Sequence, residues 1–170
     1  MDGFNGDTKI IYSIANNNVF IKSLNFKDAF DKLVGKNDIE VFINNPYNGT
    51  RIWNLTKFYS FLSQEWFEFV IEGLCDRANW TKFKLTPNQT LPVLRDNILS
   101  DLPARSIKPG DKLLFDASLY TMSEYDFSQI MPLTVKETVY KRYTENCYSA
   151  KVLNEENPYF VLANGLITHR

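Results

Sequence analysis

The residues best suited to covalent or metal chemistry are few: one histidine, His169, and two cysteines, Cys75 and Cys147. A structural zinc site needs four ligands in close pairs, and two cysteines do not make a disulfide framework. We therefore predict no metal and no cofactor, and we interpret both cysteines as buried, unreactive thiols.

A second group of polar residues lies in the segment Thr86-Pro87-Asn88-Gln89, between two apolar runs. Proline followed by asparagine is typical of a tight turn. The side chains of Thr86, Asn88 and Gln89 can make hydrogen bonds, but Gln89 cannot deliver a proton at neutral pH. From the residues alone, the segment is either an ordinary turn or a hydrogen-bonding site.

The composition indicates one globular domain. Of 170 residues, 44% are hydrophobic and 23% charged, which separates the chain from disordered ones. The net charge of −1 gives no general reason to bind nucleic acid or an anionic membrane. No apolar run approaches the roughly 20 residues of a membrane helix, and the first residues do not resemble a signal peptide. We expect a cytoplasmic, reducing setting, with neither nucleic acid nor membrane as partner.

The first third predicts a strand over 9–14, a turn at 16–18, a strand over 19–21 and then a helix. Asn25 is the expected N-cap, and Gly35 stands where a C-terminal glycine belongs. The apolar residues at helical spacing are Phe26, Ala29, Phe30 and Leu33.

Residues 37–80 predict a helical insertion. The residues that follow an i, i+3, i+4 rule are Leu55, Phe58, Tyr59, Leu62, Trp66, Phe69 and Val70. This spacing is typical of an amphipathic helix, here ending near Gly73, whose aromatic side chains pack into a core. We expect the insertion to lie outside the β-core and to contribute nothing to the chemistry.

The second half predicts short strands separated by turns. Residues 83–86 and 91–94 flank the turn at Pro87-Asn88, and residues 107–114 form a turn that enters a strand. Residues 149–152 and 159–167 are the expected closing strands, broken at Asn164-Gly165, a strong hairpin signal. The prediction is one mainly β domain with one or two inserted helices.

Four separated segments resemble, in the same order, the sequence blocks of inteins. Residues 3–10 resemble the opening block, in which a nucleophile precedes Gly-Asp-Thr; here the last three are Gly6-Asp7-Thr8. Residues 85–93 resemble the Thr-x-x-His block, and 107–114 resemble the Gly-Asp turn that follows it. The pair 147–152 and 159–170 resembles the closing blocks, which carry Asn-Gly and end in His-Asn.

The resemblance implies a horseshoe-like Hint fold with pseudo-twofold halves, spanning residues 1–170 as one domain of mini-intein length without a homing endonuclease. Residues 1–2 would belong to the upstream flank. The hedgehog-type autoprocessing domains share this fold, but the ending at His169 favours the intein.

The function implied is autocatalytic protein splicing, in which an intein excises itself and joins its flanks. The first residue of an intein is a Cys or Ser that attacks the preceding carbonyl. Here that position is Gly3, which has no side chain. In the middle block, Thr and His contact the same amide; Thr86 and Asn88 match in type, and Gln89 occupies the position of His.

At the C-terminal junction of inteins, a terminal Asn cyclises with help from the preceding His. His169 matches, but Arg170 occupies the position of Asn and cannot form a succinimide. Ser149 occupies the position of an Asp that couples the two junctions in many inteins. The chain is therefore expected to be an inactivated precursor form that neither splices nor cleaves.

The expected partners are the two flanking exteins and, if the native form is split, a complementary intein fragment. The turn at 16–18 is expected to tolerate such a break. One alternative is a non-catalytic β-rich binding module, in which Gly3, Thr86, Gln89 and His169 would not cluster. Another is a secreted glycoprotein domain with sequons at Asn48, Asn54, Asn79 and Asn88; the missing signal peptide and the single pair of cysteines weigh against it.

Overall fold

The computed structural model describes residues 2–15, 19–72, 82–117, 130–153, 156 and 158–169. The strands are β1 (Phe4–Asn5), β2 (Lys9–Ile14), β3 (Val19–Asn25), β4 (Ile39–Asn44), β5 (Arg51–Ile71), β6 (Lys82–Leu85), β7 (Thr90–Arg95), β8 (Ile98–Pro103), β9 (Lys112–Asp116), β10 (Ile130–Val152), β11 (Tyr159–Val161) and β12 (Ile167–His169). The helices are α1 (Phe26–Leu33) and the 3-10 turn η1 (Ala104–Ser106). The predicted mainly β fold is therefore confirmed.

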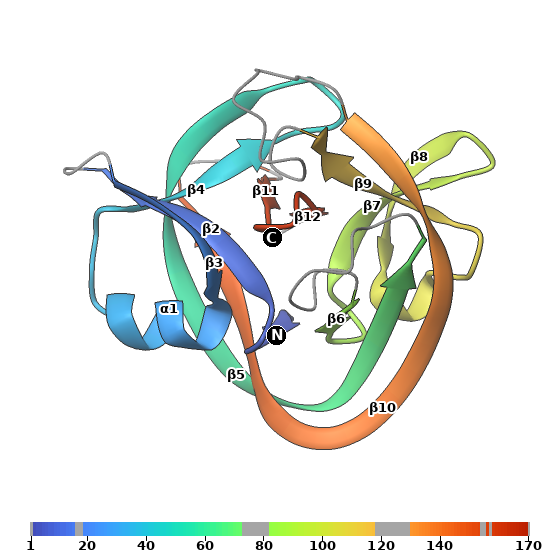
Figure 1. Ribbon diagram of the computed structural model, residues 1–170, viewed down its shortest axis with the longest axis horizontal. Coiled ribbons are helices and arrows are strands. Elements are labelled where there is room, and N and C mark those ends of the chain that lie inside the picture. The colour runs from blue at the N-terminus through green and yellow to red at the C-terminus, as the bar shows by residue number, and fades with distance from the viewer. Residues whose placement is uncertain are drawn as a thin grey trace.

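Two long, bent strands, β5 and β10, organise the molecule. They pair antiparallel from Val135 opposite Ile71 to Val152 opposite Thr56, and together they curve around the lower half of the molecule (Figure 1). Beyond this ribbon, the start of β5 pairs with β4 and the start of β10 pairs with β9. Each long strand thus belongs both to the central ribbon and to one of two lateral lobes.

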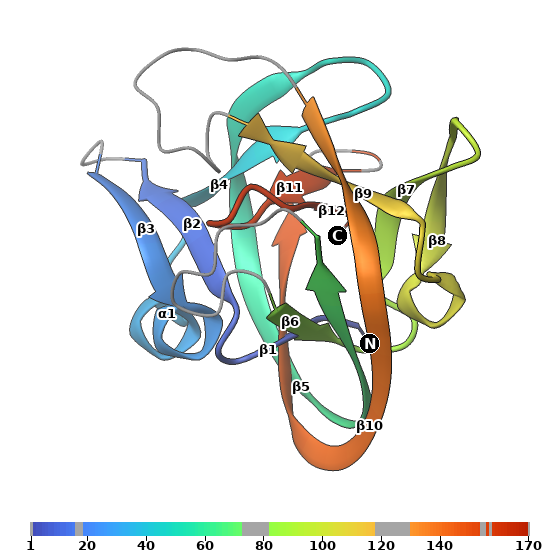
Figure 2. The same cartoon turned by 45° about the vertical axis from the view of Figure 1, so that its right-hand side comes forward.

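The two lobes are visible on opposite sides of the ribbon (Figure 2). One contains β2, β3, β4 and α1, and the other contains β7, β8 and β9. In the second lobe, β7 and β8 are joined at Asp96 and Asn97, whose φ angles of 51° and 62° suit a type I′ hairpin turn.

The predicted helix over 26–33 is confirmed. The Asn25 side chain caps it by accepting a hydrogen bond from the backbone N–H of Asp28 at 3.0 Å. Phe26, Ala29 and Leu33 are buried against the ribbon, and Gly35 follows with a φ of +82°. The strand over 9–14 and the hairpin at Asn164-Gly165 are confirmed as well. The turn at 16–18 lies outside the described residues.

The predicted helical insertion is wrong. Residues 39–44 form β4, and the aromatic stretch forms β5, which pairs with β4, β6 and β10 at the centre of the fold. Pairing is regular from Trp66 to Val70, so Trp66 and Phe69 lie on opposite faces of β5; both are buried, Trp66 against Tyr143 and Phe69 against Phe83. A strand covered on both faces therefore produced the three-residue spacing of a helix, while its aromatic content already favoured a strand. The predicted end near Gly73, like Cys75, lies outside the described residues.

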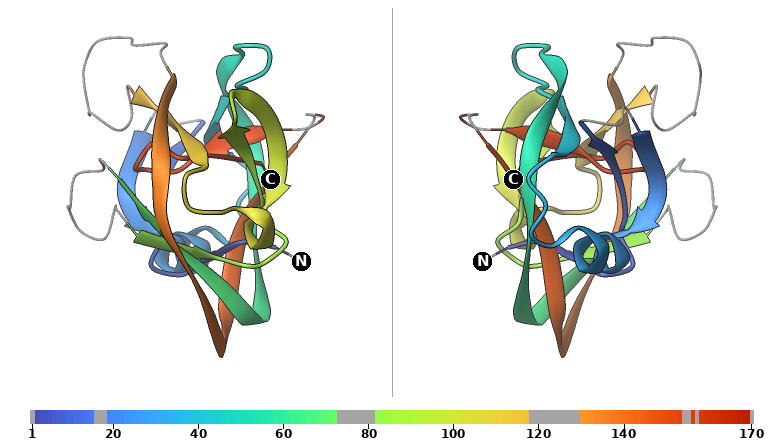
Figure 3. Two further views of the ribbon diagram at one scale, coloured as in Figure 1. Left: turned by 90° about the vertical axis from the view of Figure 1, so that its right-hand side faces the viewer. Right: turned by 90° about the vertical axis from the view of Figure 1, so that its left-hand side faces the viewer.

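The two ends of the described chain approach the middle of the molecule from the same side (Figure 3). β1 lies between β6 and β10, whereas β12 is reached through β11 from β4. An interior strand, β1, and an edge strand, β12, therefore bring the start and the end of the chain toward each other. No described helix is long and apolar enough to cross a membrane.

Candidate functional site

The start of the chain is held by Thr86, at the end of β6. The backbone N–H of Gly3 donates to Thr86 Oγ1 at 3.0 Å, and the backbone N–H of Thr86 donates to the Gly3 carbonyl at 2.9 Å. The Thr86 hydroxyl in turn donates to Asp2 Oδ1 at 3.3 Å. Thr86 is buried, so its hydroxyl is committed to the peptide unit that joins Asp2 and Gly3.

Thr86 and Gln89 are the first and last residues of a four-residue turn. The backbone N–H of Gln89 donates to the Thr86 carbonyl at 3.1 Å, which closes the turn predicted at Pro87-Asn88. The η1 turn anchors this segment, because Ala104 N donates to the Gln89 carbonyl and Arg105 N to the Pro87 carbonyl. Thr86 and Gln89 are thus fixed at the two ends of one rigid turn.

The end of the chain is held by Gln89. Its Nε2 donates to the backbone carbonyl of His169 at 2.5 Å and to Thr168 Oγ1 at 3.1 Å. Gln89 is 1% exposed and Thr168 is fully buried, so these contacts are shielded from water. Continuous hydrogen bonding therefore connects Gly3, Thr86, Gln89 and His169, four residues that the sequence places up to 166 positions apart.

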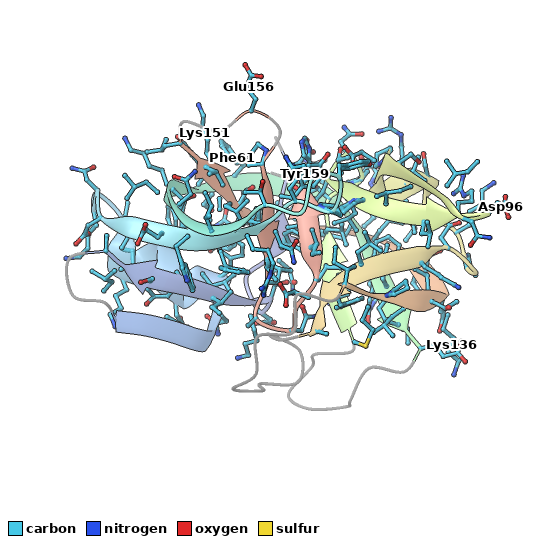
Figure 4. The ribbon with its side chains drawn as sticks, turned by 90° about the horizontal axis from the view of Figure 1, so that it is seen from above. Phe61, Asp96, Lys136, Lys151, Glu156 and Tyr159 are labelled. Carbon is cyan, nitrogen blue, oxygen red and sulfur yellow. The ribbon has the colours of Figure 1, made fainter. Side chains whose placement is uncertain are left out.

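The His169 ring packs against Tyr159, its antiparallel partner on β11, with 5.0 Å between the ring centroids. The Tyr159 hydroxyl donates to Asp101 Oδ2 at 2.6 Å, and the exposed Tyr47 donates to Asp101 Oδ1 at 3.1 Å. Burial, followed by the bond to Asp101, raises the pKa of Tyr159. Figure 4 shows Tyr159 near the middle of the molecule, between the two lobes. The histidine therefore rests on a neutral, hydrogen-bonded phenol.

Ser149 is the residue of β10 next to the pairing with β1. Phe4 pairs with Tyr148 and Asn5 with Cys147, Gly3 lies against the Tyr148 carbonyl, and Ser149 itself pairs with Tyr59 of β5. Asn88, by contrast, is exposed at the tip of the turn and contributes its backbone carbonyl, which accepts from Thr90 Oγ1 at 3.4 Å. The structure thus groups Gly3, Thr86, Gln89 and His169, with Ser149 alongside, and leaves the Asn88 side chain outside. Arg170 is not among the described residues.

Gly3 is closely enclosed by backbone. A Cβ atom at this position would lie 2.3 Å from the Tyr148 carbonyl oxygen and 2.8 Å from the Tyr148 carbonyl carbon. Real Cβ atoms essentially never come that close, so a side chain here requires β1 or β10 to move. The absence of a side chain at position 3 is therefore built into the packing of this site.

Three participants were missed by sequence reasoning: Asp2, Asp101 and Thr168. Asp2 and Thr168 adjoin predicted site residues, so their positions in the chain were an available signal. No local sequence signal pointed to Asp101, because its partner Tyr159 is 58 positions away in the chain. The interpretation of Cys147 as a buried thiol is confirmed, and burial raises the pKa of this thiol. Within the described ranges, no three or more His, Cys, Asp or Glu side chains are grouped to hold a metal.

Comparison with known proteins gives matches at the level of structure. No family model and no curated protein matches the sequence. The structure is similar to the TvoVMA intein, with a TM-score of 0.74 at 18% identity over 99% of this chain and 96% of that one. It is similar to an intein from a hyperthermophile, with a TM-score of 0.75 at 15% identity over the full length of both chains.

A bacterial intein-like domain from Clostridium thermocellum also matches, with a TM-score of 0.66 at 18% identity over 100% of this chain and 99% of that one. The strand pairing, the meeting of the chain ends and these matches agree: this chain has the Hint fold of inteins and intein-like domains.

Proposed function

We propose that this chain is a protein-splicing domain in an inactivated precursor form. Its chemistry would be the autocatalytic excision of the domain and the ligation of its two flanking exteins. The observation that carries the proposal is that one turn, from Thr86 to Gln89, contacts both ends of the domain. Splicing needs this arrangement because both junctions must exchange acyl groups at one place.

At the upstream junction, the scissile amide would be the one between Asp2 and Gly3. Thr86 Oγ1 lies 3.0 Å from the nitrogen that would leave. A residue at position 3 with a thiol or hydroxyl would attack the Asp2 carbonyl and transfer the acyl group to its own side chain. Gly3 supplies no such atom, so the first step is absent.

At the downstream junction, Gln89 holds the peptide carbonyl of His169 and thereby orients the segment that leads to residue 170. An Asn at position 170 would cyclise through its carboxamide and release the downstream flank. Arginine has no carboxamide. His169 would protonate the leaving amine or polarise the reacting carbonyl, and its packing on Tyr159 restricts the ring for that role.

The clustering supports splicing over the binding-module alternative, which gives no reason for the two chain ends to share a buried polar turn. The flanking exteins are accordingly the proposed partners. If the native form is split, a complementary fragment would join them by restoring the pairing of β2 with β3 and β4.

Restoring the missing groups tests the proposal. The chain is placed between two unrelated flanking proteins, with Cys, Ser or Thr after residue 170. Arg170→Asn alone should permit C-terminal cleavage. Gly3→Cys alone should permit thiol-induced cleavage of the upstream flank, and both changes together should permit splicing. Gel electrophoresis and intact-mass measurements report each product.

Gly3→Ala is the matched control, because it adds the same crowded Cβ without a thiol. It should be destabilised like Gly3→Cys and remain uncleaved. Gln89→His should accelerate the first step if that step limits, since general acid catalysis contributes about 100- to 10,000-fold. A folded Gly3→Cys, Gln89→His, Arg170→Asn variant that cleaves at neither junction would refute the proposal.

A further inference from the structure

The Asp2–Gly3 dipeptide has a chemistry of its own that does not depend on a nucleophile at position 3. An aspartyl residue followed by glycine can close a five-membered ring when the glycine nitrogen attacks the aspartyl side-chain carbon. Glycine favours this reaction because it has no Cβ to hinder the approach. The same dipeptide lies at the polar turn from Thr86 to Gln89, which contacts both ends of the described chain.

Thr86 is hydrogen-bonded to both groups that react in this ring closure, the Gly3 N–H and the Asp2 carboxylate. Its Oγ1 accepts the Gly3 N–H at 3.0 Å and donates its own proton to Asp2 Oδ1 at 3.3 Å. The nucleophilic nitrogen has to lose a proton, and the departing carboxyl oxygen has to gain one. A single buried hydroxyl therefore lies between the proton that leaves and the oxygen that receives it.

The surroundings hold these groups together. Thr86 N donates to the Gly3 carbonyl at 2.9 Å, so Gly3 is fixed on both sides of its peptide unit. Backbone atoms of Tyr148 close off the side where a Cβ would lie. Asp2 is half-buried and Gly3 buried, while the chemistry needs only one proton and later one water from solvent.

We propose that Asp2–Gly3 is a self-modification site, at which Thr86 relays a proton during formation of an aminosuccinimide and then an isoaspartyl bond. The Asp2 carboxylate takes one proton from solvent. The Gly3 nitrogen bonds to Asp2 Cγ as its proton passes to Thr86 Oγ1, and the Thr86 proton passes to the departing oxygen. The Cγ–O bond breaks, one water leaves, and the imide forms without any change of oxidation state.

Water then opens the imide at either carbonyl. Attack at Cγ regenerates aspartate, whereas attack at the main-chain carbonyl leaves the chain running through the side chain of residue 2. The product has the mass of the starting protein and one additional methylene in its backbone. It lies at the position of the upstream junction, and its formation requires neither cleavage nor splicing.

The test follows residue 2 in the full-length protein, incubated folded and, in parallel, unfolded in urea. After digestion at mildly acidic pH, mass spectrometry of the peptide ending at Lys9 detects the loss of one water. Chromatography and fragmentation then quantify the isoaspartyl form. Asn48–Gly49, in an exposed turn, is the internal reference, because its ring closure releases ammonia and does not involve Thr86.

We expect modification of Asp2 to be at least about tenfold faster in the folded than in the unfolded protein, because the relay exists only when the site is assembled. Thr86→Val, which removes the hydroxyl but keeps the shape, should slow it about 100-fold, and Thr86→Ser should restore it. The rate at Asn48 should be the same in all three folded proteins.

A rate at Asp2 that is equal or slower in the folded protein overturns the proposal, and this comparison needs no variant. An undiminished rate in folded Thr86→Val overturns it as well. If Thr86→Val fails to fold, Thr86→Ser and the folded-to-unfolded ratio of the unsubstituted chain decide the matter. None of these measurements depends on splicing, so failure of the splicing proposal would be recognised separately.

Discussion

Gln89 donates its side-chain amide to the backbone carbonyl of His169 across 2.5 Å, although the two residues are 80 positions apart in the chain. The same amide nitrogen reaches Thr168 Oγ1 at 3.1 Å. This contact attaches β12, at the end of the fold, to the turn that also holds Gly3. It makes one small polar cluster responsible for the position of both chain ends.

Gln89→Met tests the strength of that attachment. Methionine keeps the length of the side chain and loses the hydrogen bonds, so the free energy of unfolding should fall by about 1–3 kcal/mol. Urea unfolding followed by fluorescence measures the change. Asn88→Ala, in the same turn but exposed, should change it by no more than about 0.5 kcal/mol. Equal effects of the two substitutions would contradict the assigned contacts.

Trp66 tests the central role of β5. The indole is fully buried, stacks on Tyr143 at 5.5 Å and donates to the Tyr143 carbonyl at 3.2 Å. Trp66→Ala should cost about 3–5 kcal/mol, enough to unfold a marginally stable domain. Leu62→Ala, in the same strand but 72% exposed, is the control and should have little effect. A folded protein after replacement of residues 51–71 by a short linker would contradict the position of β5 in the core.

Asp111 should make the domain sensitive to acid. The hydrogen bonds from Arg95, at 2.8 and 2.7 Å, are the largest cause that lowers the pKa of Asp111 from 3.8. A carboxyl with a lowered folded-state pKa contributes stability above its unfolded pKa, and that contribution is lost as pH falls through the folded-state value. Melting temperature should therefore decline as pH falls below about 4, toward pH 3.

Asp111→Asn should lower the melting temperature at neutral pH and flatten its decline in acid. Asp31→Asn is the isosteric control, because Asp31 is exposed on α1, in the lobe that does not contain Arg95 and Asp111. This control should leave the decline of the melting temperature in acid unchanged. If the melting temperature of Asp111→Asn still declines in acid as it does in the unsubstituted protein, other carboxyls determine that decline.

Tyr159 should act on the downstream junction as a positioning residue for His169. In an Arg170→Asn background, Tyr159→Phe removes the bond to Asp101 and should slow C-terminal cleavage by up to about tenfold. Tyr47→Phe removes the longer, exposed bond to the same carboxylate and should have a smaller effect. Rates of release of the downstream flank over a range of pH measure both.

Thiol-induced cleavage at a Gly3→Cys junction is the internal control for those variants, because neither tyrosine contacts Gly3 or Thr86. The upstream rate should be unchanged. A parallel loss at both junctions would indicate general destabilisation and contradict the positioning role.

Local signals in the sequence determined the parts of the structure that depend on near neighbours. Asn25 predicted the helix N-cap, Pro87-Asn88 predicted a turn, and Asn164-Gly165 predicted a hairpin. Each of these conformations follows from hydrogen bonds and dihedral preferences within a few residues. The order of the four blocks along the chain gave the Hint fold. For the proposed splicing function, the sequence also gives the residue types at the two junction positions, where Gly3 has no nucleophilic side chain and Arg170 has no carboxamide.

Only the tertiary structure decided what depends on distant segments. The apolar spacing over 51–71 predicted a helix, and only the pairing with β4, β6 and β10 shows that the stretch is a strand covered on both faces. Asp101 could not be connected to Tyr159, nor Gln89 to the His169 carbonyl, from any local pattern. Pairings of this kind are set by how the lobes pack together. The packing also fixes how closely Tyr148 encloses Gly3, since the backbone of β10 is brought there by partners far away in the chain.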